Sequence, residues 1–282
     1  MLTVSEARER ILVNFQPVEI KTVPPARAAS RVLAGDIVAE TDLPLFDNSS
    51  MDGFSLRVSD TDGATTASPW NLEVVADIRA GDYSDAPLQP GQAARIMTGA
   101  LLPPGAEAVV MVEDTDFNVR LAGTPAPQTV AINKPMRAAE NVRRRGDDLH
   151  AGDKVLSAGS RLRAQEIGLL AMLGVAEVPV YRQPKVALLS SRDELLPVDV
   201  PLPPGKIHDA NSYLLASLAA PAGADLLQLG VAADTEADVR SGLEQAIEIK
   251  ADVIVSSTGV SVGHSTTSSP SSKRTVNWIS GE

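Results

Sequence analysis

The sequence predicts a multi-domain protein that combines α/β and all-β folds, and two observations support this. Between Phe54 and about Val142, short apolar runs alternate with Gly, Pro and Asp, which is typical of a small β domain. From Lys185 onward, strands alternate with helices, which favours a parallel, doubly wound sheet. The length of 282 residues also exceeds the size at which a single core usually stops growing, about 250 residues.

The N-terminal segment predicts two short helices followed by a loop. Apolar spacing indicates a helix over Ser5–Val13 with Ser5 as its N-cap. Ala28–Val38 is interpreted as a second short helix leading into a strand. Asp42–Gly53 consists of turn residues without periodicity, so we expect a loop there.

The remaining elements follow from apolar periodicity and turn signals. Ligands in parallel sheets bind beyond the carboxyl ends of the strands, so polar residues at those ends are candidate site residues. Strands are expected at Asn71–Ile78, Ala93–Met97, Ala108–Val112, Val175–Tyr181, Val186–Ser190, the LLQLGV run and Ala251–Ser256; helices are expected at Gln165–Leu173 (ending before Gly174), Asn211–Ala219 and Glu236–Lys250.

Composition excludes several classes of protein. A net charge of −11 and a pI of about 4.8 argue against a nucleic-acid binder, which needs a basic face. The absence of cysteine excludes disulfides and thiolate metal sites. No apolar run approaches the roughly 20 residues of a membrane span, and the charged N-terminus does not resemble a signal peptide. We therefore expect a cytoplasmic protein without membrane partners.

Two loops in the first half carry polar residues that suit a ligand. In FDNSSMDG, Asp47 and Asp52 suit a hard cation or a polar ligand; the alternative is a turn whose Asp and Asn side chains bond their own backbone. Thr98-Gly99 follows a strand and offers a hydroxyl and a close backbone approach to an anion. A plain β-turn explains this pair equally well.

Three further motifs follow. ENVRRRGDD offers arginines for anion recognition, although most charge runs are solvated faces. SSRDEL follows the strand at 186–190, so Asp193 and Glu194 are candidates for metal binding or hydrogen bonding; the alternative is a helix N-cap. SSTGVSVG follows the strand at 251–256 and offers hydroxyls and backbone N–H groups to a phosphate.

Each motif alone is weak evidence for a function, but the order of the motifs and their amino-acid sequences are together specific. FDNSSMDGF, TGALLPPGAEAVVMVED, ENVRRRGDD, AGSRL, EIGLLAMLGVAEVPVYRQPKVALLSSRDEL, KIHDANSYLL and SSTGVSVG follow one another over residues 1–263. In this respect the chain resembles the molybdopterin molybdenumtransferases of the MoeA and gephyrin E-domain family. The resemblance implies an elongated N-terminal domain (1–45 and 141–182), a small β domain (46–140) and a MogA-like molybdopterin-binding α/β domain (183–263).

The resemblance also implies a function. The family inserts molybdate into adenylylated molybdopterin with release of AMP, assisted by Mg²⁺, and its members are homodimers. It implies catalytic roles for Asp52, Thr98, Asp148 and Glu194, a metal ligand at Asp234, and substrate binding by Asp193, Asp209, Asn211, Thr258, Gly259, Ser261 and Gly263.

The chain departs from the family pattern in three places. Arg192 stands where the family usually has Gly before the Asp-Glu pair, and it either crowds the site or points to solvent. Pro221 falls where the family helix usually continues, which should shorten that helix. After Gly263 the Ser-rich stretch 264–282 replaces the family's continuation, so the α/β domain is expected to be incomplete and the C-terminal β domain absent.

Two interpretations of residues 264–282 stand side by side. One is a disordered polar tail. The other is a one-base slip in the gene or its reported sequence near Gly263, because the shifted frame permits FDYIKP, EENG and LDFW in the family's order. In that frame Asn277-Trp278 requires Leu and Trp278-Ile279 requires Asp. The coding DNA around Gly263 tests this expectation.

We therefore expect a transferase of molybdenum cofactor synthesis whose activity is impaired by truncation. The alternative is a non-catalytic remnant that dimerises or binds molybdopterin. A nucleotide-binding module with another ligand is disfavoured, because the resemblance extends well beyond the α/β segment.

Overall fold

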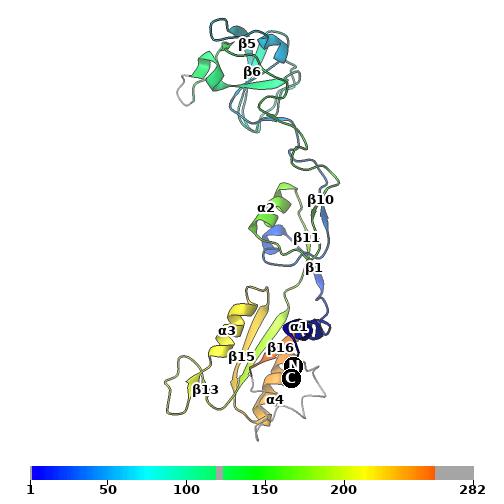
Figure 1. The fold of residues 1–282 in the computed structure, drawn as a ribbon, viewed down its shortest axis with the longest axis vertical. Helices are drawn as coiled ribbons and strands as arrows, with labels where there is room; N and C mark the ends of the chain where they lie inside the picture. Colours follow the sequence, from blue (N-terminus) through cyan, green and yellow to red (C-terminus); the bar gives the residue numbers. More distant parts are fainter. Residues whose placement is uncertain (1, 119–122, 258–282) are drawn as a thin grey trace. The chain divides into compact units, whose positions relative to one another are not determined.

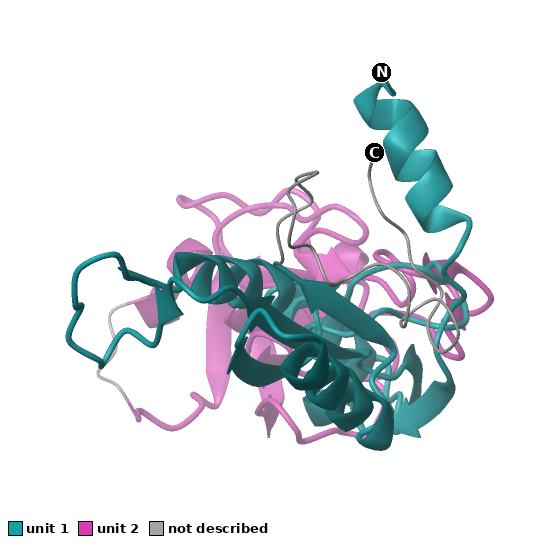
Figure 2. Cartoon of the chain, turned by 90° about the horizontal axis from the view of Figure 1, so that it is seen from below, with its two compact units in different colours: residues 1–36, 156–282 teal, residues 37–155 magenta. Residues whose placement is uncertain are grey.

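A computed structural model of the chain describes residues 2–118 and 123–257 (Figure 1). The chain divides into two compact units, coloured separately in Figure 2. One unit comprises Met1–Asp36 with Leu156–Glu282, and the other is the continuous stretch Ile37–Val155. The expected combination of α/β and β folds is confirmed, while the expected domain boundaries at residues 46, 141 and 183 stay predictions.

The 37–155 unit is built on a five-stranded sheet with the strand order β7-β4-β6-β5-β8. Strand β4 runs antiparallel to both β6 and β7, whereas β5 is parallel to β6 and antiparallel to β8. Alternating apolar residues such as Phe54, Leu56, Leu72 and Val130 form its core. The strands span Gly53–Leu56 (β4), Trp70–Ile78 (β5), Gln92–Ile96 (β6), Ala108–Met111 (β7) and Thr129–Ile132 (β8).

Several short strands and 3₁₀ turns accompany the five-stranded sheet along residues 37–156. The segment expected to be a loop, Asp42–Gly53, contains the two-residue strand β3, which pairs antiparallel with β9. These short elements are β2 (Ile37–Val38), β3 (Asn48–Ser49), β9 (Val142–Arg143), β10 (Lys154–Leu156) and the 3₁₀ turns Val58–Thr61, Val112–Asp114 and Asp116–Asn118.

The N-terminal helix α1 (Val4–Leu12) begins earlier than expected, on a different cap. The cap is Thr3 and not Ser5, because Thr3 and Glu6 form a reciprocal capping box. The short helix expected to begin at Ala28 is wrong, whereas the strand expected to follow it is present as β2. The 3₁₀ turn Pro25–Arg27 ends just before Ala28, and the chain then makes isolated bridges from Val32 and Leu33 to distant residues.

The unit formed by Met1–Asp36 and Leu156–Glu282 contains two further elements outside its α/β part. Strand β1 (Ile20–Val23) pairs antiparallel with β11 (Val178–Tyr181), although the strand was expected to begin earlier, at Val175. Helix α2 (Ala164–Met172) ends as expected, since Gly174 follows the C-cap with a φ of 71°.

The α/β part has the expected parallel strands. Strand β12 (Lys185–Ser191) lies between β15 (Asp225–Ala232) and β16 (Val253–Ser256) and is parallel to both. Helix α3 (Ala210–Ala219) ends just before Pro221, as expected, and α4 (Glu236–Glu248) follows β15. An unexpected parallel pair, β13 (Leu195–Leu196) with β14 (Ile207–His208), precedes α3.

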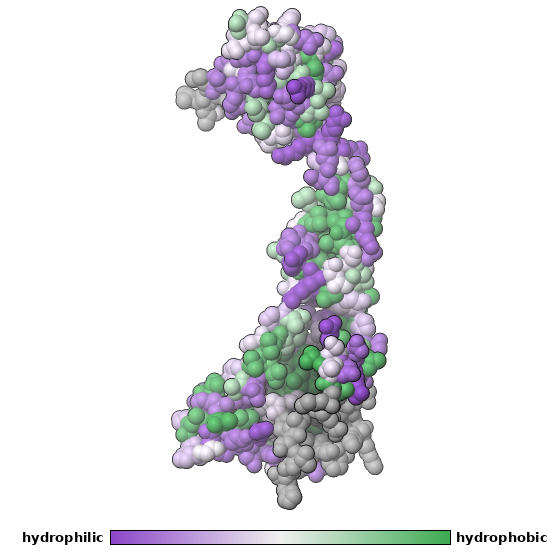
Figure 3. Space-filling model, in the orientation of Figure 1, coloured by the Kyte–Doolittle hydropathy of each residue, from purple (hydrophilic) through white to green (hydrophobic). Residues whose placement is uncertain are grey.

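The two helices cover opposite faces of β12. Ser190 hydrogen-bonds Ser212 of α3, whereas the neighbouring Leu189 lies against Gly242 of α4. Successive side chains on a strand alternate between faces, so the helices lie on either side of the sheet. The outer side of α3 is apolar, with Tyr213, Leu214 and Leu218 exposed (Figure 3).

Two candidate functional sites

The structure brings three of the sequence motifs together within the 37–155 unit. Backbone hydrogen bonds join Gly99 N to Ser49 O over 2.8 Å and Ser49 N to Ala100 O over 3.1 Å. On its other side, Ser49 pairs with Val142, which directly precedes the arginine run. FDNSSMDG therefore lies between TG and RRRGDD, and we call this region the first site.

Asp52 and Thr98 contact each other directly in the first site. The Asp52 carboxylate accepts hydrogen bonds from Thr98 N at 2.9 Å and from Thr98 Oγ1 at 2.8 Å. These bonds lie at an exposed position, so the pair is accessible from solvent. Because the Thr98 hydroxyl donates to Asp52, its lone pairs are left for a ligand.

Gly53 follows Asp52 for a packing reason. A Cβ at this position would lie 1.9 Å from Val110 O on the neighbouring strand β7. Only glycine allows β4 and β7 to approach this closely, and this contact fixes the backbone that carries Asp52.

The arginine run is anchored by aspartates of the first loop. Arg145 Nε donates to Asp42 Oδ2 over 2.6 Å, and Arg145 N donates to Asp47 Oδ1 over 2.8 Å. The other Asp42 oxygen accepts from Ala151 N at 2.8 Å. That backbone bond first, and Arg145 second, lower the pKa of Asp42. Asp42 was not among the sequence candidates, because its partners lie far along the chain.

The third predicted residue of the first site, Asp148, is placed differently. Its backbone N–H donates to Leu43 O at 2.9 Å, and its exposed carboxylate has no partner among the described residues. Arg143 and Arg144 are also exposed, and their guanidinium groups have no partner in the same part of the chain. The structure thus joins Asp52 to Thr98 but leaves Asp148 and two arginine side chains unengaged within the described ranges.

The second site lies at the carboxyl ends of β12 and β15. Asp193 follows β12, and its Oδ1 accepts a hydrogen bond from Asp234 N at 3.0 Å, just beyond the end of β15. Lys206 Nζ donates to the Asp193 carbonyl oxygen over 2.6 Å. Within residues 2–118 and 123–257, no group of three His, Asp or Glu side chains has the arrangement of a metal site.

Arg192 does not crowd this site. It is exposed, and its Nη1 lies 3.0 Å from Glu194 Oε1. The pKa of Glu194 is lowered, first by a hydrogen bond from its own backbone N–H and then by Arg192. A carboxyl group with a lowered pKa is ionised at neutral pH, so Glu194 suits charge stabilisation better than proton donation.

Asp209 is the buried member of the second site. Only 4% of the residue is exposed, and it caps helix α3 by accepting from Ser212 N at 3.2 Å and from Ser212 Oγ at 2.5 Å. Burial opposes ionisation, but hydrogen bonds from Ser212 and Ser190 outweigh it and lower the pKa of Asp209. Asn211 is exposed on the first turn of α3.

The hydroxyls of Ser190 and Ser257 also lie at this edge, 2.9 Å apart, and the sequence had not singled out Ser190. In the sequence, Ser190 is a polar residue at the end of an apolar strand. A buried serine with a purely structural role gives the same pattern, so the sequence could not identify Ser190 as a site residue. The remaining predicted residues, Thr258, Gly259, Ser261 and Gly263, lie outside the described part of the chain.

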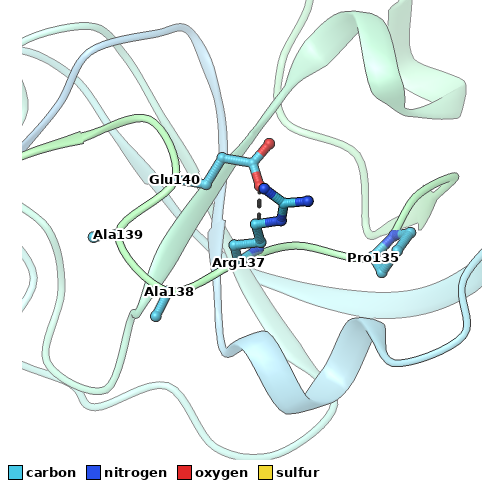
Figure 4. A pocket seen from close by; sticks show the side chains of 5 residues that line it. All are labelled: Pro135, Arg137, Ala138, Ala139 and Glu140. Atoms are coloured by element: carbon cyan, nitrogen blue, oxygen red, sulfur yellow. Dashed lines mark hydrogen bonds between the residues drawn. The ribbon is translucent and has the colours of Figure 1, made fainter.

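A shallow hollow elsewhere on the 37–155 unit contains none of the predicted site residues. Its volume is about 420 Å³, and two of its lining residues are joined by a hydrogen bond of 3.1 Å from Arg137 N to Glu140 Oε2 (Figure 4). It is lined by Pro135, Arg137, Ala138, Ala139 and Glu140.

The structure also contains no helix, among the residues it describes, that is long and apolar enough to cross a membrane.

Comparisons with known protein families match most of the chain. Residues 2–174 match the family described as "MoeA N-terminal region (domain I and II)". Residues 187–269 match the "Probable molybdopterin binding domain".

Individual relatives agree with these matches. A molybdopterin molybdenumtransferase 2 of Mycobacterium tuberculosis is 42% identical over 242 residues, covering 86% of this chain and 58% of the relative. A molybdopterin molybdenumtransferase of Nostoc is 41% identical over 239 residues, covering 84% of this chain and 52% of the relative. The solved structure of a molybdopterin biosynthesis MoeA protein from Pyrococcus horikoshii has a TM-score of 0.76 at 30% identity, covering 95% of this chain and 69% of that one. The chain thus spans little more than half the length of these two transferases.

Proposed function

Since the chain belongs to the MoeA family, we propose that it acts as a molybdopterin molybdenumtransferase. The reaction takes adenylylated molybdopterin and molybdate, inserts the metal at the dithiolene and releases AMP. The observation that carries this proposal is the set of carboxylates at the ends of β12 and β15, with Asp193 bonded to the backbone of Asp234. A phosphorylated substrate that arrives with a divalent cation needs carboxylates of this kind.

Mg²⁺ is part of the proposal, and the described residues fit a cation that is shared with the substrate. Magnesium is usually held by one or two carboxylates, with water and substrate phosphate oxygens completing its shell. Asp234 is exposed and adjacent to Asp193, and Glu194 carries a charge nearby in sequence. When bound, the cation would neutralise phosphate charge as AMP leaves.

The residues of the first site are proposed to act on the other reactants. The Asp52 carboxylate is oriented by its two hydrogen bonds from Thr98, so it can accept a proton or hold an N–H or O–H group in place. The exposed carboxylate of Asp148 and the side chains of Arg143 and Arg144 lie on the same anchored segment. Arginines of this kind suit an oxyanion such as molybdate. We further propose a cytoplasmic homodimer.

Molybdenum insertion by the purified chain tests the function. Adenylylated molybdopterin, molybdate and Mg²⁺ are supplied, and the product is measured by its ability to activate an enzyme that lacks the cofactor. We expect activity that falls by about 10²-fold or more in Asp52→Asn, as for loss of a general base. Arg57→Gln, in the same unit as Asp52 but outside the residues assigned to either site, is the control and should keep its activity.

Rescue of a cofactor-deficient cell by the 282-residue chain gives a second readout. A chain that binds adenylylated molybdopterin but neither rescues nor inserts molybdenum would instead be a binding or dimerisation remnant. That result would refute the transferase proposal.

A further inference from the structure

Three serine hydroxyls and one carboxylate form a chain of hydrogen bonds at the second site. Ser257 Oγ lies 2.9 Å from Ser190 Oγ, Ser190 Oγ lies 2.7 Å from Ser212 Oγ, and Ser212 Oγ donates to Asp209 Oδ2 over 2.5 Å. This row of hydrogen bonds connects the carboxyl ends of β16 and β12 with the first turn of α3. We call these four residues the acceptor corner.

Counting protons fixes the direction of every bond in this chain. A serine hydroxyl has one proton to donate and two lone pairs that accept. The Ser212 proton is already given to Asp209, so the single Ser190 proton is directed towards the same pair, Ser212 and the Asp209 carboxylate. The Ser190 proton therefore points to the Asp209 side, and Ser257 must donate in its contact with Ser190.

Ser257 is consequently left as a hydrogen-bond acceptor. Its hydroxyl proton is committed to Ser190, and its backbone N–H donates to Leu189 O at 3.1 Å. Ser257 is only half-buried, so its remaining lone pairs are within reach of a ligand. A phosphate oxygen needs donors, and this residue has none left to offer.

The negative charge near the acceptor corner also disfavours an anionic ligand group. Asp209 is almost fully buried and ionised, and Asp193, Glu194 and Asp234 follow the neighbouring strands. In the described part of the chain, the two cations that contact these carboxylate residues are engaged, because Arg192 pairs with Glu194 and Lys206 donates to the Asp193 carbonyl. Negative charge and acceptor groups repel a bare anion and favour a ligand edge that carries N–H groups.

We propose that the acceptor corner binds the donor edge of the ligand, namely the amino and ring N–H groups of a pterin, and not its phosphate. The identification of that ligand as a pterin rests on the proposed function. Ser190 is a positioning residue in this arrangement, since its buried hydroxyl turns the Ser257 proton inward.

Equilibrium binding of two probes tests the proposal, with 2-amino-4-oxopteridine as the donor edge and inorganic phosphate as the anion. Ser257→Ala removes the accepting hydroxyl and should weaken pterin binding by about 3- to 10-fold, the usual effect of one hydrogen bond, without weakening phosphate binding. Ser190→Ala releases the Ser257 proton, so pterin binding should weaken while phosphate binding stays equal or strengthens.

Ser191→Ala is the matched control, because Ser191 is the next residue of β12 and is 1% exposed. Its hydroxyl donates to Ala233 O over 3.5 Å and takes no part in the acceptor corner. This variant should change neither affinity. If Ser190→Ala does not fold, as judged by circular dichroism, the Ser257→Ala variant still tests the proposal, because Ser257 is only half-buried.

Two results would overturn the proposal. One is a wild-type chain that does not bind the pterin, and the other is a Ser257→Ala variant that loses phosphate affinity and keeps pterin affinity. The proposed transferase function fails separately. A chain that binds pterin in the expected pattern but inserts no molybdenum keeps the acceptor corner and loses the enzymatic assignment.

Discussion

At the scale of single residues, Gly53 shows how packing supports the first site. The residue lies between Asp52 and the buried Phe54, and its α-carbon faces the backbone of β7 at a distance that leaves no room for a methyl group. The contact is with a backbone carbonyl, so no side-chain rotation can relieve a clash there.

Gly53→Ala should therefore destabilise the 37–155 unit by about 3 kcal/mol or more, at the upper end of overpacking effects. Urea denaturation followed by the fluorescence of Trp70, in β5 of this unit, measures the loss. Gly168→Ala is the control, because Gly168 is helical and nothing lies within 4 Å of the place that an added methyl group would occupy. The interpretation is wrong if both variants unfold at the same denaturant concentration.

Arg192 is the second residue whose effect can be isolated. It lies 3.0 Å from Glu194 and helps to keep the pKa of that carboxyl low, after the contribution of the Glu194 backbone N–H. Arg192→Gly should raise the pKa of Glu194 towards its ordinary value without restoring it, because the backbone hydrogen bond remains.

Titration of the Glu194 side-chain carboxyl by NMR checks this shift. Arg240→Gly, which removes the exposed ion pair with Glu236 on α4, serves as the control. An unchanged Glu194 pKa in Arg192→Gly would show that the ion pair is not formed in solution.

At the scale of elements, one ion pair ties the end of β11 to the start of the parallel sheet. Arg182 follows β11 and binds Asp252 through two hydrogen bonds of 2.6 and 2.5 Å, while Asp252 also accepts from Lys185 N at 2.7 Å. Arg182 is the main cause that lowers the pKa of Asp252, and burial opposes it. A depressed pKa means that this stabilisation is present above the unfolded-state pKa and is lost as the pH falls through the folded-state value.

Asp252→Asn should destabilise the sheet by about 1–2 kcal/mol at pH 7. The difference from the wild type should shrink as the solution is acidified below about pH 4, near the ordinary Asp pKa. Hydrogen exchange of the β12 and β16 amides at several pH values measures both effects. Asp225→Asn, at the exposed start of β15, is the matched control, and equal effects of the two variants would contradict the assignment.

At the scale of the whole molecule, the two units differ in how the chain builds them. The 37–155 unit is continuous and has its own core around Phe54, Leu72 and Val130. The other unit joins two distant segments, because β1 pairs with β11.

Residues 37–155 expressed alone should therefore fold, since a continuous segment with its own core satisfies the usual conditions for an independent domain. A dispersed amide NMR spectrum and a cooperative unfolding transition are the expected results. A collapsed spectrum would show that this unit depends on the rest of the chain.

The sequence by itself determined α3, α4, the three strands of the parallel sheet and the identity of the motifs, because these depend on local periodicity and on the order of the motifs along the chain. It did not predict the two-residue strands β13 and β14. It failed for the short helix expected after Ala28, where Val32 and Leu33 instead form bridges to Arg161 and Val180. Only the tertiary structure decided how the site residues are used. Asp52 meets Thr98 across 46 positions, Arg145 meets Asp42 across 103, and Ser190 meets Ser257 across 67. Hydrogen bonds between such distant residues form only after the chain has folded, and they determine which groups are left to bind a ligand.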